Sequence, residues 1–158
     1  MIIVGIGDYN ISNNKHETMI TYALGSCVAL VIYNKQNGWT AMAHIVLPNP
    51  SNGYKHDDHR MKPGYFATDI VPKLLEFFLG ELKSKKSELS VYIVGGADSI
   101  QEKDVFLVGQ KNVEIVTHLL NIYGISQYES DTGGNVSRTV SIQCWDGYVL
   151  IKNQKMIL

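Results

Sequence analysis

The residues best suited to covalent chemistry in this chain are Cys27 and His44, a candidate nucleophile and a candidate base. Cys27 opens the apolar run 28–33, and His44 follows it by seventeen positions. Turn-forming residues fill 34–38, and 39–47 is strand-like again, so the whole stretch predicts a β-hairpin. The meeting of thiol and ring therefore depends on the register of that hairpin.

The predicted register places the thiol opposite the imidazole. If Tyr33 faces Gly38 across a four-residue loop, Cys27 faces His44, because paired residue numbers keep a constant sum of 71. Directly opposed side chains have Cβ atoms about 4.5–5.5 Å apart, which allows a hydrogen bond between thiol and ring. A one-residue slip would put them on opposite faces. Pairing with an imidazolium lowers a cysteine pKa from about 8.5 by several units, so we expect an activated nucleophile.

Neighbouring residues supply the other groups that such a site needs. Gly25 permits close approach of a substrate, and the backbone amides of Ser26 and Cys27 are candidates for an oxyanion hole. Thr21 lies in the strand-like segment 18–22, and its hydroxyl can accept a hydrogen bond from the ring nitrogen that faces away from sulfur. This set predicts attack on a carbonyl or carboxamide, a covalent acyl-enzyme, and its hydrolysis by water.

Each of these residues also has an ordinary structural interpretation. A cysteine that opens an apolar strand is usually a small core residue, and from spacing alone this is the commoner outcome. His44, between Ala43 and Ile45, fits a core histidine with satisfied nitrogens, and Thr21 fits a β-branched strand residue. The matched register and the Gly-Ser pair before the thiol favour the catalytic interpretation.

The segment from Leu24 to Val28 resembles the most specific motif of the CheD family, the chemoreceptor glutamine deamidases of bacterial chemotaxis. Other pieces of the family pattern occur along most of the chain in the same order. They are Ile6, Gly7 and Asp8; Thr21; Ala43 to Pro48; Tyr65, Ala67, Asp69 and Pro72; Gly95, Gly96 and Ala97; Val108, Gly109 and Asn112; and Asp131, Gly133 and Gly134. Together their order and spacing make the chain similar to this family.

The resemblance implies an activity and a role for three residues. By position, the family's nucleophile is Cys27, its base is His44, and the threonine that completes the site is Thr21. The implied reaction hydrolyses selected glutamine side chains to glutamate through a thioester and releases ammonia. Its substrates are the cytoplasmic helices of chemoreceptors, and neither a cofactor nor a metal is expected.

The same resemblance implies a second partner and a competing function. Some family members bind a CheC-type phosphatase, so the chain is also a candidate for a non-catalytic adaptor that binds receptors or such a phosphatase. The intact set of cysteine, histidine and threonine argues against lost catalysis. Two departures, Val94 for the usual phenylalanine and Ser137 for a glycine before Arg138, bear on substrate contact and partner choice.

A polar loop offers a weaker enzymatic alternative. Residues 49–64 are rich in Gly, Pro, Asn and charge, and His56, Asp57, Asp58 and His59 form a ligand-like cluster within them. A metal hydrolase using this cluster with His44 is conceivable. A solvated loop is the better interpretation, because two histidines three positions apart in a polar stretch are not held in a coordination geometry.

Composition narrows the class of protein. The chain has 158 residues of which 45% are hydrophobic, so residues 1–158 are expected to form one domain. With 14 basic against 15 acidic residues, nucleic acid is not expected as a partner. No signal peptide or membrane-spanning run is visible, so we expect no membrane insertion and a cytoplasmic location. Cys27 and Cys144 make no disulfide framework, and Cys144 is expected to be a buried structural thiol.

The remaining elements predict an α+β fold of layered β-sheets with two long flanking helices. Helices are expected over 65–83 and 110–123, where apolar residues recur at helical spacing. Asp146 and Gly147 predict the turn of a second hairpin. The expected strands are Ile2 to Gly7, Thr18 to Tyr22, Cys27 to Tyr33, Trp39 to Leu47, Leu89 to Val94, Ser126 to Glu129, Arg138 to Cys144 and Tyr148 to Ile151.

Overall fold

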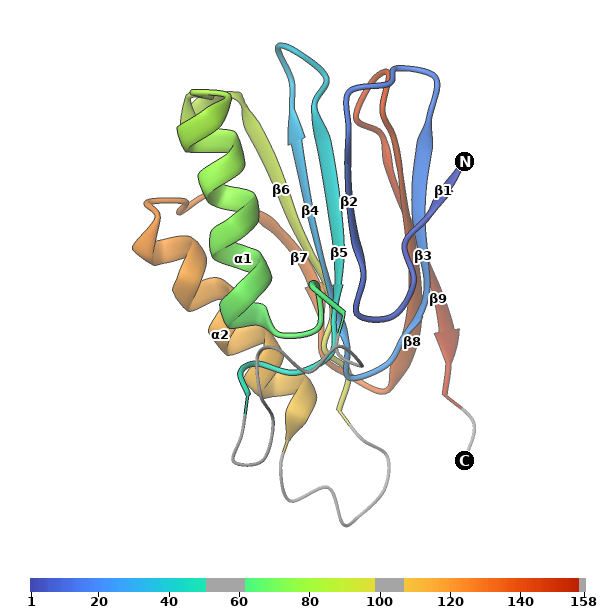
Figure 1. Cartoon of the computed structure of the whole chain (residues 1–158). Coiled ribbons are helices and arrows are strands. Elements are labelled where there is room, and N and C mark those ends of the chain that lie inside the picture. The colour runs from blue at the N-terminus through green and yellow to red at the C-terminus, as the bar shows by residue number, and fades with distance from the viewer. Residues whose placement is uncertain (51–61, 99–106, 157–158) are drawn as a thin grey trace.

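Two stacked β-sheets and two helices form three layers (Figure 1). The computed structural model describes residues 1–50, 62–98 and 107–156. The four-stranded sheet has the order β1 (Ile2–Ile3), β3 (Thr18–Leu24), β8 (Val136–Gln143), β9 (Val149–Lys155). The five-stranded sheet has the order β2 (Tyr9–Ser12), β5 (Thr40–Ile45), β4 (Val28–Asn34), β6 (Leu89–Gly95), β7 (Glu129–Thr132).

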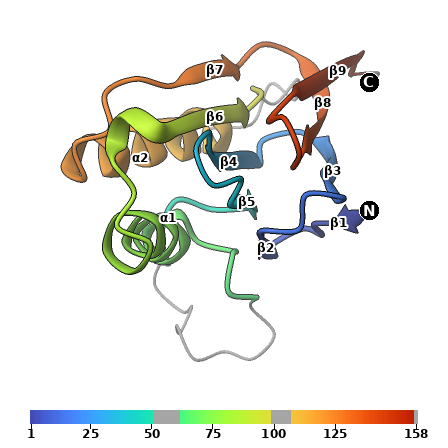
Figure 2. The same ribbon diagram turned by 90° about the horizontal axis from the view of Figure 1, so that it is seen from above.

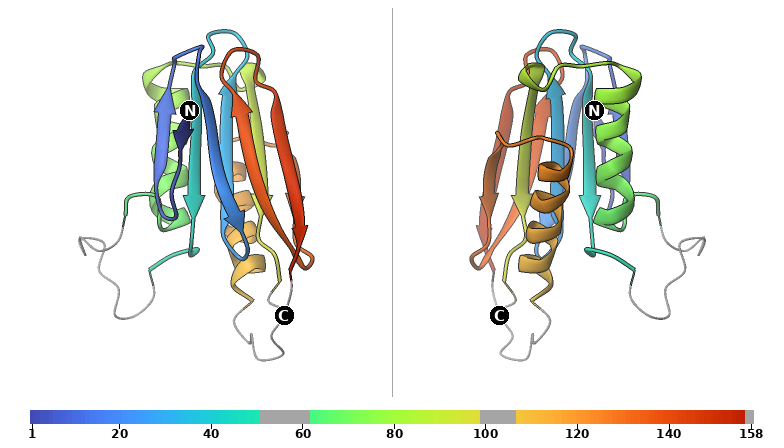
Figure 3. Two further views of the ribbon diagram at one scale, coloured as in Figure 1. Left: turned by 90° about the vertical axis from the view of Figure 1, so that its right-hand side faces the viewer. Right: turned by 90° about the vertical axis from the view of Figure 1, so that its left-hand side faces the viewer.

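Both helices cover the outer face of the five-stranded sheet, as the view from above shows (Figure 2). Helix α1 (Ala67–Glu76) continues into a π-helical turn (Phe77–Glu81), and α2 (Val108–Ile122) lies beside it. A short 3₁₀ helix (Lys86–Glu88) precedes β6. The two side views show the four-stranded sheet with no helix on its outer face (Figure 3). The predicted α+β architecture of layered sheets with two flanking helices is confirmed.

The five-stranded sheet lies between two apolar cores. Leu30 and Ile32 of β4 face the helices and pack with residues such as Leu74 of α1, while Val31 faces the other sheet and packs with residues such as Val140 of β8. Every residue of β4 is buried. The absence of polar alternation in this run, which predicts burial on both faces, is explained by its central place in a covered sheet.

The first hairpin forms as predicted, but its register is two residues longer than expected. Tyr33 pairs with Thr40 rather than with Gly38. The side-chain oxygen of Asn34 accepts hydrogen bonds from the amides of Gln36 at 2.8 Å and Asn37 at 3.1 Å, which stabilises a wider turn. His44 therefore pairs with Ala29, and the expected direct pairing of His44 with Cys27 is wrong.

Other boundaries also differ from the sequence prediction. Only Ile2–Ile3 of the expected first strand is a strand, because the chain turns at Gly7, whose φ is 76°. Strand β2, with the sequence Tyr-Asn-Ile-Ser, was not predicted, because its polar residues resemble a loop. The expected strand 126–129 begins later, as β7, whereas the second hairpin forms as predicted between β8 and β9.

Candidate active site

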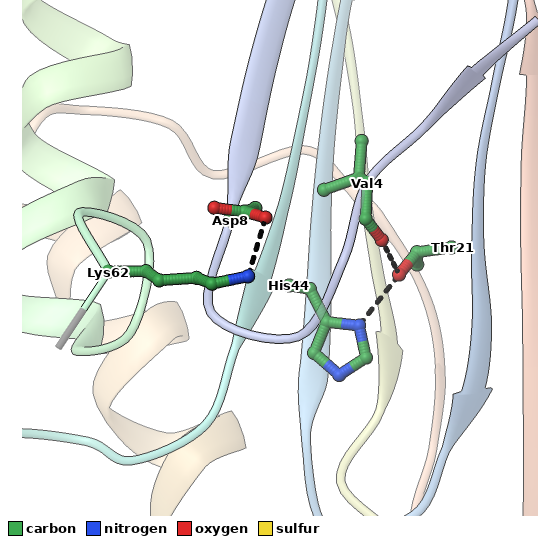
Figure 4. Close-up of polar contacts among 5 residues, drawn as sticks. All are labelled: Val4, Asp8, Thr21, His44 and Lys62. Carbon is green, nitrogen blue, oxygen red and sulfur yellow. Dashed lines mark hydrogen bonds and ion pairs between the residues drawn. The ribbon is translucent and has the colours of Figure 1, made fainter. Parts of the chain in front are cut away.

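The imidazole of His44 lies near the end of β5, between the two sheets. Its side chain is buried, with 1% of the residue exposed. The N-terminal turn wraps its backbone, because the His44 amide donates to the Asp8 carbonyl at 2.9 Å and the Gly7 amide donates to the His44 carbonyl at 2.9 Å. An ion pair of 3.0 Å between Lys62 and Asp8 holds the segment that begins at Lys62 against the same turn (Figure 4). These contacts fix the backbone that carries the ring.

Thr21 orients the ring from the opposite sheet. Its hydroxyl oxygen lies 2.7 Å from the Val4 carbonyl oxygen and 2.6 Å from Nδ1 of His44 (Figure 4). A carbonyl only accepts, so the single hydroxyl hydrogen is donated to Val4, and the hydroxyl oxygen accepts from Nδ1–H. The imidazole is thereby held in the tautomer whose Nε2 carries a lone pair and is able to accept a proton. The predicted contact of Thr21 with the ring is present.

Cys27 lies immediately before β4, on the same side of the sheet as His44. Alternation places Cys27 on the face of Ala29, the residue opposite His44, and its side chain packs against the core between the sheets. Because the register error is two residues, it preserves the face, and the pair is diagonal instead of directly opposed. Diagonal neighbours in a sheet are about 7–8 Å apart, still within reach of a long side chain. Among the described residues, the thiol makes no hydrogen bond, and both cysteines of the chain are free.

Burial keeps both reacting groups neutral. It raises the pKa of the Cys27 thiol from 9.0 to about 11 and lowers the pKa of His44 from 6.5 to about 4. Near pH 7 the site therefore holds a thiol and a neutral imidazole. Burial therefore opposes the activated thiolate that the sequence predicts, because the Thr21 hydroxyl carries no negative charge that would stabilise an imidazolium beside the thiol.

In the loop before β4, the carbonyls accept hydrogen bonds, whereas two amides have no acceptor among the described residues. The carbonyl oxygens of Gly25, Ser26 and Cys27 accept hydrogen bonds from the Ala97 amide at 2.9 Å, the Asn112 side chain at 3.0 Å and the Gly96 amide at 2.8 Å. The amides of Ser26 and Cys27 donate to no atom of the described residues. Unpaired donors beside a nucleophile are the arrangement that an oxyanion hole requires.

Close backbone contacts support this loop from behind. Gly95 has a φ of 113°, and a Cβ there would clash with the Cys27 carbonyl oxygen. A Cβ at Gly109, in the first turn of α2, would clash with the Ala97 carbonyl oxygen. The buried guanidinium of Arg138 donates to the Gly95 carbonyl at 3.4 Å. Glycine at these positions allows β6, α2 and the loop of Cys27 to meet, at the lower end of the molecule in Figure 1.

Several supporting residues were not assigned a role from the residue pattern alone. Arg138 also pairs with Asp131, with Nε 3.1 Å from the carboxylate, and donates to the Gly133 carbonyl at 2.8 Å. Asn112 is fully buried and contacts the loop of Cys27 directly. A buried arginine within a strand and an asparagine on the buried face of a helix are the signals that point to such roles.

The metal alternative falls outside the described residues, because His56, Asp57, Asp58 and His59 all lie in 51–61. Over 1–50, 62–98 and 107–156 no group of three or more His, Cys, Asp or Glu side chains is arranged to hold a metal ion. Within the same ranges, no helix is long and apolar enough to cross a membrane. Cys144 is fully buried, as expected for a structural thiol.

Comparison with known proteins finds a family and near full-length relatives. Residues 46–153 match the family described as CheD chemotactic sensory transduction. The Probable chemoreceptor glutamine deamidase CheD 1 of Syntrophus aciditrophicus is 32% identical over 152 residues, covering 96% of this chain and 93% of that protein. The Chemoreceptor glutamine deamidase CheD of Thermotoga maritima is 35% identical over 150 residues, covering 95% of this chain and 90% of that protein. These two alignments extend beyond the family match, which begins after His44.

A solved structure is also similar, at a lower level. The crystal structure of Bacillus licheniformis hypothetical protein YfiH aligns with a TM-score of 0.49 and 12% identity, covering 78% of this chain and 50% of that chain. Agreement of this size carries no conclusion about chemistry.

Proposed function

The chain belongs to the CheD family, and we propose on that premise that it hydrolyses glutamine side chains of chemoreceptors to glutamate, with release of ammonia. The observation that supports this most is that a thiol, an oriented imidazole and two backbone amides without acceptors among the described residues lie at one end of the sheets. We propose Cys27 as the nucleophile, His44 as the base and Thr21 as the residue that orients the base. The substrate glutamines lie on the cytoplasmic helices of the receptors, so the reaction takes place in the cytoplasm.

Acylation begins from the neutral pair. Sγ of Cys27 attacks the carboxamide carbon as its proton passes to Nε2 of His44, and the carbonyl π electrons move to oxygen. The amides of Ser26 and Cys27 donate to the resulting oxyanion. His44, now an imidazolium, gives the same proton to the nitrogen of the leaving group. The C–N bond breaks, ammonia leaves, and the substrate remains as a thioester on Cys27.

Deacylation repeats these steps with water. Nε2 of His44 removes a proton from a water molecule as its oxygen attacks the thioester carbon, and the oxyanion again binds the two amides. Collapse breaks the C–S bond, and the proton on Nε2 returns to sulfur. The product is a glutamic acid side chain, which releases its proton to solvent to become glutamate, and the enzyme is restored with a neutral thiol and a neutral ring.

The hydroxyl at Thr21 suits this cycle, in which charge on the imidazole is transient. An acceptor without charge orients Nδ1–H but does not stabilise an imidazolium at rest, so burial holds the pKa of His44 at about 4. The base is therefore unprotonated at neutral pH. In the proposed cycle proton transfer and sulfur attack occur together, because burial disfavours both the thiolate and the imidazolium at rest.

Mass spectrometry of receptor fragments tests the proposed function. Incubation with the wild-type protein should convert particular glutamines to glutamate, and Cys27→Ala should convert none. Cys144→Ala is the matched control, because its thiol is buried and remote from the proposed chemistry. Hydroxylamine added during turnover should trap the thioester as a hydroxamate. Equal conversion by the wild type and Cys27→Ala would refute the proposal.

A CheC-type phosphatase is proposed as a second protein partner, on the family resemblance alone. Co-purification of the chain with such a phosphatase from the same organism tests it. Binding by a protein that converts no glutamine on any receptor fragment would instead support the adaptor function.

A further inference from the structure

Asn112 links the two segments that carry the proposed nucleophile and base. It lies on α2 with its side chain fully buried. Its Nδ2 donates to the Ser26 carbonyl at 3.0 Å and to the Val46 carbonyl at 2.9 Å. Ser26 directly precedes Cys27, and Val46 follows His44 by two residues. Both hydrogens of one side-chain amide are thus spent on holding the two segments at a fixed separation.

The contact with Ser26 also determines where the amide of Cys27 points. The carbonyl of Ser26 and the N–H of Cys27 belong to one peptide group, which is planar and trans, so they point in opposite directions. A donor on the carbonyl therefore directs the N–H away from α2. It also polarises the peptide group and makes the N–H a stronger donor. The same geometry applies to the Ser26 amide, since the Gly25 carbonyl is bound by the Ala97 amide.

The environment of the acceptor atom of Asn112 indicates that this residue does more than stabilise the fold. Oδ1 is buried and has no hydrogen-bond partner among the described residues. A buried polar atom without a partner costs roughly 1–3 kcal/mol, which an apolar side chain of similar size would avoid. An amide at this position is explained if its two N–H groups position the backbone of the proposed active site.

We propose that Asn112 is a positioning residue that directs the Cys27 amide into the oxyanion hole. This inference rests on the proposed function, because it presumes that an oxyanion forms beside Cys27. It concerns only steps that pass through a tetrahedral intermediate. Reactions of the same thiol that form no oxyanion should not depend on Asn112.

Two reactions of Cys27 separate this role from general stability, and both are measured in a Cys144→Ala background. Acylation by p-nitrophenyl acetate forms a tetrahedral oxyanion, whereas alkylation by iodoacetamide displaces iodide at a saturated carbon and forms none. Asn112→Leu should slow acylation, and deamidation of receptor fragments, by on the order of 10- to 100-fold. Alkylation measured at the same pH should be unchanged.

Asn34→Ala is the matched control, because Asn34 is a fully buried asparagine at the opposite end of β4. Its Nδ2 donates to Oγ of Ser84 at 2.9 Å, so replacing it with alanine should destabilise the protein without changing the proposed active site. Asn112→Leu and Asn34→Ala are compared at conditions that give them the same free energy of unfolding. Only Asn112→Leu should then slow acylation while the rate of alkylation stays unchanged. Parallel loss of both reactions, or no loss of acylation or deamidation, would overturn the inference. Undiminished deamidation by Cys27→Ala would instead refute the proposed function.

Discussion

Alkylation of Cys27 between pH 6 and pH 11 measures directly whether the resting thiol is neutral. Iodoacetamide reacts with the thiolate, so its rate follows the ionised fraction. Burial raises the pKa of Cys27 from 9.0 to about 11, a difference of 2 units. At pH 8 or below, the thiolate fraction is therefore about 100-fold smaller than for an ordinary cysteine of pKa 9.0.

The expected profile is a rate that rises about tenfold per pH unit and levels off only near pH 11. The assay uses Cys144→Ala, with mass spectrometry to locate the label on Cys27. A rate that is already on a plateau between pH 6 and pH 7 would show that a thiolate–imidazolium pair exists in the resting enzyme. That outcome would refute the concerted acylation proposed above, together with the electrostatic reasoning behind it.

Four further predictions concern the same site. The kcat/KM of deamidation should fall on the acid side with a pKa of about 4, that of His44, and should show no inflection near 6.5. In the unfolded state the His44 ring binds a proton below pH 6.5, and in the folded state it does so only below about pH 4. The free energy of unfolding should therefore decrease as pH falls across this window. Urea titrations should show a decrease that is about 3 kcal/mol larger in the wild type than in His44→Gln. Thr21→Val should lower kcat by on the order of 100-fold, because Nδ1–H loses its acceptor, and Thr21→Ser should retain most activity. Gly95→Ala should destabilise the protein by about 2–4 kcal/mol in urea unfolding, because of its φ of 113° and the clash with the Cys27 carbonyl; wild-type stability would contradict the close contact.

The hairpin illustrates how far sequence reasoning reaches. Alternation in two apolar runs was enough to predict that Cys27 and His44 share a face, because parity survives an error of two residues. The length of the turn was not predictable from turn-forming composition alone. It depends on Asn34, whose side chain binds two amides of the turn and adds two residues to it.

The protonation states of Cys27 and His44 are not predictable from the residue pattern. The residue types suggested an ion pair, but the pKa values depend on how deeply the folded chain buries each group, and spacing carries no such information. The three carbonyl contacts behind the loop of Cys27 were equally invisible, since they join segments some 70 to 86 positions apart, such as Cys27 with Gly96 and Ser26 with Asn112. Long-range contacts of this kind follow from sheet order, which single-sequence patterns do not determine.

Thr21 belongs to the four-stranded sheet, whereas the ring that it orients belongs to the five-stranded sheet. The hydrogen bond between Thr21 and His44 therefore joins the two sheets. Separation of the two sheets would break this hydrogen bond without disturbing α1 and α2, which pack on the five-stranded sheet. If Thr21 acts as proposed, the rate of deamidation should respond to the spacing of the two sheets more sensitively than helix content does. A partner that binds across both sheets would then change the rate without contacting Cys27 or His44.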